Sequence, residues 1–354
     1  MEPNGKRREK VLLISAAGVG DWFIALPLQR ILAENTDFTL LCMDNVYPFA
    51  KVQKWLPQIW EYKISEMQGY SLFTRIINFI FILGKIYFKG IDTIILPVSV
   101  GGSIGIRSLL RFSFSVKKKI GFDYPGLSGL LTDVIPLDGA KKDSELNSEI
   151  LKLTGHKGKS GGASFRIPEE LLDEARVYSD KTFGGNKFIV FHPYANLTKG
   201  KRERWLKDDA YKKLLGEFIL DNPGTGIFLV GSHAYGEKLK SLAETDPENI
   251  KVVPFDKGLL FVAGLIHFSS LVLCVDGGIM HISASMGKKI VSIWGPTPLR
   301  RTYESEIWKL IRHPMPCHPC WDNEMLHKCG HLDCLHKINP DEIVKAVNEL
   351  LNIE

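Results

Sequence analysis

The sequence lacks a hydrophobic run long enough to cross a membrane. Its most apolar stretch, IINFIFIL at residues 76–83, falls well short of the roughly 20 residues that a membrane-spanning helix needs, and Lys85 and Lys89 follow closely. We therefore expect a buried or interfacial helix there. The segment MEPNGKRREK also lacks the apolar core of a signal peptide, so we expect a cytoplasmic protein.

Long polar tracts and a strong charge imbalance are absent as well. Hydrophobic residues make up 45% of the chain and charged residues 24%, which predicts a protein that folds throughout. The net charge is only +5. Basic clusters at residues 6–10 and 117–119 are typical of solvated surface, with a face toward anionic lipid or a phosphorylated ligand as the alternative.

The dinucleotide fingerprint G-x-G-x-x-G is missing too. Neither AAGVGD at residues 16–21 nor VDGGIM at 275–280 has its spacing, which argues against a standard nicotinamide-dependent dehydrogenase. AAGVGD lies between a strand-like run and a helical pattern, and Asp21 stands where the N-cap of that helix is expected.

The chain alternates short apolar runs with helical patterns, which predicts parallel sheets covered by helices on both faces. Its 354 residues exceed the roughly 250–300 at which single cores stop growing, so we expect two domains. The expected strands are residues 11–15, 38–43, 93–98, 188–191, 226–230, 271–275 and 290–294, and the expected helices include 209–220, 237–243, 280–286 and 340–351.

The alternation is interrupted between about residues 154 and 186 by glycine-rich joints around one charged helix. This interruption is the expected linker. We divide the chain into a first Rossmann-like domain at residues 1–165, a linker at 166–185, a second Rossmann-like domain at 186–338 and a C-terminal helix at 339–354.

The segment VDGGIMHISASMGKKIVSIWGPT, residues 275–297, places polar residues where two predicted strands end. Asp276 follows the first strand, and Gly277 and Gly278 form the expected turn into a helix. Gly295-Pro296-Thr297 follows the second strand at the same sheet edge, where open α/β sheets bind ligands. Glycine permits close approach and a helix N-terminus offers N–H groups to phosphate. Alternatively, Asp276 only caps a helix and His281 is a satisfied core histidine.

Four of the six cysteines gather in PCHPCWDNEMLHKCGHLDCL. A Cys-x-x-Cys pair with two more cysteines nearby is a zinc or iron signal in a reducing compartment. Unliganded structural thiols and a redox function are the alternatives. We expect the other two cysteines, which lie in strand-like runs, to be small core residues. The candidate metal ligands are Cys317, Cys320, Cys329 and Cys334, and the expected core cysteines are Cys42 and Cys274.

These segments together resemble the lipopolysaccharide heptosyltransferase family, glycosyltransferase family 9. Residues 275–297 are similar to its Asp-Thr/Ser-Gly-x-x-His motif and the following Gly-Pro-Thr. LLISAAGVGDWFIALPLQRIL, FHPYANLTKGKRERW and IFLVGSHAYGEKLKSL resemble three further family segments in the same order. Gly277 departs from the family's Thr or Ser and Lys289 from its proline, which leaves the donor open.

The resemblance implies an α/β fold of GT-B type, with two Rossmann-like domains whose parallel sheets face a central cleft. It implies an inverting glycosyltransferase that moves a heptose or related sugar, with ADP-heptose as the expected donor, to a lipopolysaccharide core or other surface glycan. The first domain would bind the acceptor, and Asp21 would be the base that deprotonates its hydroxyl. Capping of the following helix is the alternative role of Asp21.

The donor residues implied by the resemblance come from two segments. A basic side chain from KGKRER would stabilise the diphosphate; we name Lys201, with Lys199 and Arg202 as open alternatives. Asp276 would hold sugar or ribose hydroxyls, and the N–H groups of residues 277–279 would bind the diphosphate. His281 would help to set the loop. The expected donor contacts are Asn196, Thr198, Lys201, Asp276, Gly277, Gly278, Ile279 and His281.

No cofactor is required for this chemistry, because cationic side chains and a helix N-terminus can stabilise the leaving diphosphate. A structural zinc or iron at the cysteines is a separate expectation. The expected partners are a nucleotide-sugar, a saccharide or glycolipid acceptor and the inner membrane surface, without nucleic acid. Two other classes stay open: a nucleotide-binding oxidoreductase or epimerase, and a non-catalytic, metal-stapled interaction protein.

Overall fold

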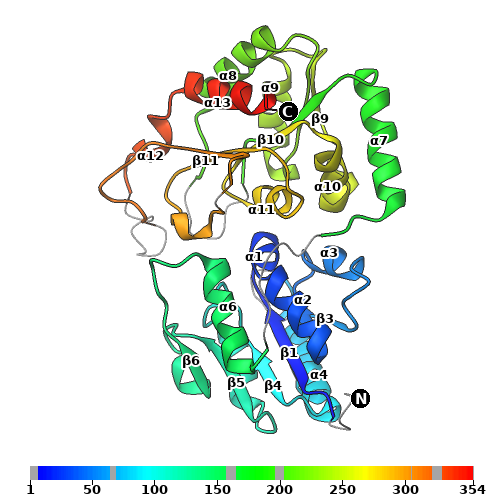
Figure 1. Ribbon diagram of the computed structural model, residues 1–354, viewed down its shortest axis with the longest axis vertical. Coiled ribbons are helices and arrows are strands. Elements are labelled where there is room, and N and C mark those ends of the chain that lie inside the picture. The colour runs from blue at the N-terminus through cyan, green and yellow to red at the C-terminus, as the bar shows by residue number, and fades with distance from the viewer. Residues whose placement is uncertain are drawn as a thin grey trace. The chain divides into compact units, whose positions relative to one another are not determined.

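The computed structural model describes residues 7–63, 69–156, 165–195, 203–303, 305–320 and 329–353 (Figure 1). The chain divides into two compact units, residues 1–164 and 165–354. The charged part of the expected linker forms α7 (Glu169–Phe183), which packs on α10 (Gly258–Phe268) of the second unit. A side chain at Gly264 would collide with the Cβ of Ala175, so glycine allows these two helices to pack closely.

The first unit contains a six-stranded parallel sheet of order β3-β2-β1-β4-β5-β6. Its central strand β1 is buried on both faces, as expected for a continuous apolar run between layers of helices. The strands are β1 (Lys10–Ser15), β2 (Asp37–Cys42), β3 (Ile59–Glu61), β4 (Thr93–Ile95), β5 (Lys118–Phe122) and β6 (Asp133–Ile135). The helices are α1 (Val19–Ile24), α2 (Leu26–Asn35), α3 (Tyr47–Lys51), α4 (Leu72–Lys89), α5 (Ile104–Phe112) and α6 (Asp143–Thr154).

The second unit repeats this architecture, with a six-stranded parallel sheet of order β12-β11-β10-β7-β8-β9. In Figure 1 the C-terminal helix α13 lies beside α8, and it also packs on β10 and β11. The strands are β7 (Phe188–His192), β8 (Gly226–Leu229), β9 (Ile250–Val252), β10 (Leu271–Val275), β11 (Ile290–Trp294) and β12 (Trp308–Arg312). The remaining α-helices of the described residues are α8 (Asp208–Asp221), α9 (Gly236–Ala243), α11 (Gly278–Ser285), α12 (Asp333–His336) and α13 (Pro340–Leu351).

The prediction of parallel sheets covered by helices is confirmed, and β10, β11 and α13 have the predicted bounds. Two details were wrong. The strand expected at residues 93–98 ends at Ile95, and the helix expected at 280–286 begins at Gly278. The strands β3, β5, β6, β9 and β12 were not predicted, because they are short or charged and do not stand out as apolar runs.

The apolar stretch at residues 76–83 lies in α4, which is not a buried helix. Its buried residues are Ile82 and Ile86, whereas most of its other apolar side chains are exposed. Of the two alternatives that we expected, a buried or an interfacial helix, the buried one was therefore wrong. Within the described residues, no helix combines the length and apolar character needed to span a membrane.

Candidate functional site

Three neighbouring strands of the second sheet end at the same edge. The order β11-β10-β7 is parallel, with Cys274 opposite His192 and Val275 opposite Ile293. His192 therefore ends β7 beside the segment where Asp276 follows β10, and Thr297 follows β11. This carboxyl edge is where ligands bind in open α/β sheets.

Asp276 is the centre of the polar contacts at this edge. Its side chain is buried, with the residue only 3% exposed, and its Oδ2 accepts two hydrogen bonds. Arg204 Nη1 donates one at 3.0 Å and Thr297 Oγ1 donates the other at 2.6 Å. Asp276 thus fixes the guanidinium of Arg204, which is itself largely buried.

Charge balance keeps this buried carboxylate ionised. Burial alone would raise the pKa of Asp276, but the guanidinium charges of Arg204 and Arg301 and the Thr297 hydrogen bond lower it below its ordinary value. These three charged side chains carry two positive charges and one negative charge. Guanidinium groups are suited to bind an anionic ligand such as a diphosphate.

Two histidines beside Asp276 are neutral at pH 7. His281 is 2% exposed, and burial together with the charge of Arg301 lowers its pKa to about 3 against the opposing charge of Asp276. Its Nδ1 lies 3.4 Å from the hydroxyl of Tyr303. Burial and the charge of Arg204 lower the pKa of His192 to about 4. Neither ring therefore adds positive charge to the site.

The Asp-Gly-Gly turn needs less from glycine than we expected. Gly277 has φ 173° and ψ −173°, an extended conformation that any residue adopts, and an added Cβ would lie 3.6 Å from the Cβ of Ala195. The backbone at residue 277 therefore does not require glycine. Gly278 is the first residue of α11, where the N–H groups of residues 278 and 279 lie in the first turn and have no partner within the helix ladder.

Gly295, in contrast, is required by packing. An added Cβ would lie 2.6 Å from the Cγ of Leu335, which α12 places against the end of β11. In the Gly-Pro-Thr segment, Gly295 therefore leaves room for the side chain of Leu335, and Thr297 donates a hydrogen bond to Asp276.

Asp21 lies in the first unit and is not the N-cap of its helix. Gly18 is the N-cap of α1, and Asp21 occupies the third helical position. Its Oδ2 accepts a 3.0 Å hydrogen bond from the backbone N–H of Gly18, as in a capping box. The expected N-cap position was therefore wrong, although the carboxylate does cap the helix from inside it. The following pattern is split at Ala25 into α1 and α2, and the second helix begins at Leu26 with Pro27 in its first turn.

Several predicted donor contacts lie outside the described residues. They are Asn196, Thr198 and Lys201, together with the alternatives Lys199 and Arg202. Arg204 is the last residue of KGKRER, the segment expected to supply a basic side chain, but it was not among the residues named individually. Its position next to the buried Trp205 was the available signal, because a side chain beside an anchored aromatic is held near the sheet.

The four C-terminal cysteines lie near one another. Burial raises the pKa of Cys334 to about 12, with further contributions from the charges of the other three thiols. Cys320 and Cys334 are buried, Cys317 is exposed and Cys329 is half-buried. No group of three or more His, Cys, Asp or Glu residues is arranged as a metal site within the described segments. Cys42 and Cys274 are fully buried, which confirms them as core residues.

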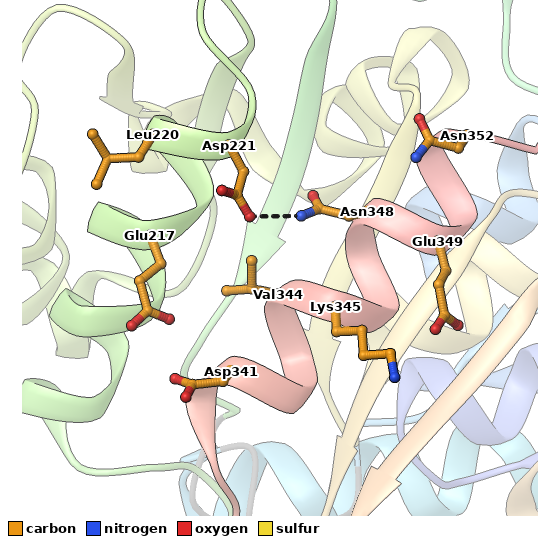
Figure 2. A pocket seen from close by; sticks show the side chains of 9 residues that line it. All are labelled: Glu217, Leu220, Asp221, Asp341, Val344, Lys345, Asn348, Glu349 and Asn352. Carbon is orange, nitrogen blue, oxygen red and sulfur yellow. Dashed lines mark hydrogen bonds between the residues drawn. The ribbon is translucent and has the colours of Figure 1, made fainter.

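A groove of about 570 Å³ lies elsewhere in the second unit, between α8 and α13 (Figure 2). Asn348 donates a 2.8 Å hydrogen bond to Asp221 across it. Its lining carries the carboxylates of Glu217, Asp221, Asp341 and Glu349 but one lysine, Lys345. Asp221 also precedes β8, which places this end of the groove at the amino edge of the sheet. The groove is therefore unsuited to a diphosphate.

Comparisons with known proteins agree with this architecture. The family model described as glycosyltransferase family 9 (heptosyltransferase) matches residues 108–330. Lipooligosaccharide heptosyltransferase 2 of Campylobacter jejuni subsp. jejuni serotype O:2 is 32% identical over 88 residues, which are 24% of this chain and 27% of that protein. The chain is thus matched over about a quarter of that relative's length.

Two solved structures show the same fold over almost the whole chain. A glycosyl transferase of family 9 from Veillonella parvula has a TM-score of 0.79 at 16% identity and covers 98% of both chains. E. coli ADP-heptose lipopolysaccharide heptosyltransferase II has a TM-score of 0.71 at 18% identity, covering 97% of this chain and 98% of that one. The predicted fold, α/β of GT-B type, is confirmed, and the chain belongs to glycosyltransferase family 9, the heptosyltransferase family.

Proposed function

We propose that this protein is an inverting glycosyltransferase that transfers a heptose or related sugar, from ADP-heptose as the expected donor, to a lipopolysaccharide core or other surface glycan. One observation carries the proposal: the buried Asp276 holds Arg204 at the carboxyl edge of β10, beside the first turn of α11. A fixed cation and the first-turn N–H groups of α11, which have no partner within the helix ladder, form a suitable site for a nucleotide diphosphate. The match to glycosyltransferase family 9 supports the same assignment.

In this mechanism Asp21 acts as the general base. Its carboxylate accepts the proton of the acceptor hydroxyl, whose oxygen attacks the anomeric carbon opposite the diphosphate. The bond between that carbon and the diphosphate oxygen breaks as the new glycosidic bond forms, so the configuration inverts. Arg204, the first turn of α11 and a basic residue of the 199–202 segment stabilise the departing negative charge.

Activity and donor binding test this proposal. Purified protein is incubated with ADP-heptose and a lipopolysaccharide core saccharide, and ADP release is measured together with the anomeric configuration of the product. We expect Arg204→Gln to weaken ADP binding by about 10- to 100-fold, since a charge-assisted hydrogen bond contributes about 1.5–3 kcal/mol. Arg176→Gln, on the exposed face of α7, is the matched control.

The proposal fails if no panel of nucleotide-sugars yields transfer or hydrolysis. A nicotinamide cofactor retained by the purified protein would instead favour the oxidoreductase or epimerase class. Inactive protein with tightly bound metal would favour the interaction protein.

We further propose that the four C-terminal cysteines hold one structural zinc or iron ion. Their thiolate chemistry suits either metal, and their mutual influence on the pKa of Cys334 supports a common location. The metal would join the tail to α12, whose Leu335 packs against Gly295. Elemental analysis should find close to one equivalent, and Cys317→Ser should lose the metal whereas Cys42→Ala retains it. Metal-free protein with full thermal stability would contradict the proposal.

We also propose that the protein binds peripherally at the inner face of the membrane, because a glycolipid acceptor is anchored there. The exposed surface of the first unit supports this localisation.

A further inference from the structure

One side of α4 is an exposed apolar surface. Phe88, for example, is 86% exposed. With 3.6 residues per turn, Ile77 and Ile86 point to opposite sides of the helix, and the first is exposed while the second is buried. The exposed apolar residues of α4 are Leu72, Phe73, Ile76, Ile77, Ile80, Phe81, Tyr87 and Phe88.

This surface continues onto α5 and the loop that follows it. The rings of Phe79 and Phe112 meet edge to face with their centres 6.0 Å apart, and those of Phe112 and Phe114 follow at 6.1 Å. Ile104, Phe112 and Phe114 are exposed. We call these three residues and the exposed apolar residues of α4 the α4–α5 patch. Contiguous apolar patches with a polar rim mark protein or membrane interaction sites.

The segment that carries the patch has charges of almost only one sign, which is positive. Residues 71–119 contain one acidic residue, Asp92, and its carboxylate accepts a 2.7 Å hydrogen bond from Arg7. Lys85 places its ammonium 4.3 Å from the ring centre of Phe81, at the side of the patch. The exposed cations of α5 and the following loop are Arg107, Arg111 and Lys117.

We propose that the α4–α5 patch docks on the surface of an anionic lipid bilayer. The apolar side chains would lie at the boundary between headgroups and acyl chains, and Arg107, Arg111 and Lys117 would face the lipid phosphates. This inference rests on the proposed function, which gives the enzyme a membrane-borne acceptor. A second copy of the chain is a less suitable partner for the patch, because a symmetric contact would bring the same cations of both copies together and they would repel each other.

Vesicle flotation tests the proposal without donor or acceptor. Wild-type protein should float with vesicles of phosphatidylethanolamine and phosphatidylglycerol, and less so with phosphatidylcholine or at high salt. Phe73→Gln/Ile80→Gln/Phe88→Gln should weaken binding by at least about 100-fold, because three exposed apolar side chains lose their insertion. Arg107→Gln/Arg111→Gln/Lys117→Gln should weaken it by roughly 100-fold, at about five-fold per cation.

The matched control is Val177→Gln/Leu220→Gln, which removes two exposed apolar residues of the second unit and should bind vesicles like the wild type. Unchanged melting temperatures establish that the variants are folded. The inference is overturned if wild-type protein stays unbound, if the α4 variant binds normally, or if the patch only mediates a dimer in sedimentation experiments.

Turnover with a water-soluble, delipidated acceptor separates this inference from the proposed function. The α4 variant should turn over that acceptor at the wild-type rate while losing vesicle binding. Vesicle binding without any transferase activity would refute the proposed function and leave the docking surface supported. Transferase activity without vesicle binding would refute the docking surface and leave the proposed function supported.

Discussion

Thr297 donates a 2.6 Å hydrogen bond from its hydroxyl to Oδ2 of Asp276, so the loop after β11 holds the carboxylate that follows β10. Arg204 donates to the same oxygen, which makes three loops of the second unit depend on one buried acid. The Asp-Gly-Gly and Gly-Pro-Thr segments are therefore parts of a single arrangement at the sheet edge.

Thr297→Val should destabilise the protein by about 1–3 kcal/mol, because it removes a donor from a buried carboxylate that keeps its charge. ADP binding should also weaken, since Asp276, the partner of Arg204, is then held by one hydrogen bond fewer. Denaturant unfolding and calorimetric titration measure the two effects. Thr297→Ser keeps the hydroxyl and is the control; equal losses in both variants would show that the methyl group, and not the hydrogen bond, matters.

Asp21→Asn should lower kcat by at least about 100-fold, the lower end for a positioned general base, with little change in ADP binding. An asparagine oxygen can still accept the bond from Gly18, so the cap is largely retained. Glu34→Gln, at an exposed position of α2, is the control. Near-normal turnover would remove Asp21 from the mechanism, and a loss of stability in its place would leave it only the capping role.

Acidification should destabilise the fold between pH 6.5 and about 4 through His281. Its folded pKa of about 3 lies below the ordinary 6.5, so in this range the unfolded chain binds a proton that the folded chain does not. Stability therefore falls with falling pH, by about 1.4 kcal/mol per unit for one such group. The pKa of Asp276 lies below 3.8, outside this window.

Unfolding free energies measured across that window check the effect. His281→Gln should reduce the slope without removing it, because His192, with a folded pKa of about 4, also contributes in this range. His233→Gln, at an exposed position, is the control. An identical slope in the His281 variant would mean that other groups control the acid sensitivity.

Gly295→Ala should cost about 1–3 kcal/mol of stability, because its methyl group would lie 2.6 Å from Leu335. Combining it with Leu335→Ala should cost less than the sum of the single changes, since the second change removes the collision. Gly277→Ser is the matched control at a glycine with room for a side chain and should be tolerated. Additive effects of the Gly295 and Leu335 changes in thermal unfolding would contradict this assignment.

Local patterns in the sequence were enough to predict the sheets and the edge that carries Asp276. Strands such as β10 and β11 are continuous apolar runs, and such runs have only one stable place, between two layers of helices. The residue after each strand then stands at the carboxyl edge whatever the rest of the chain does. This is why Asp276 and Thr297 could be placed together without coordinates.

Long-range contacts determined the features of the fold and the site that the sequence did not predict. Arg204 lies 72 residues before Asp276, and no local pattern specifies which cation a buried acid will meet. Gly295 meets Leu335 only because the tail folds back onto β11, and strands of three residues such as β3 and β9 form because a neighbouring strand supplies their hydrogen bonds. Helix α4 is apolar on its exposed side as well as on its buried side, so which of its apolar side chains meet solvent depends on how the whole unit packs.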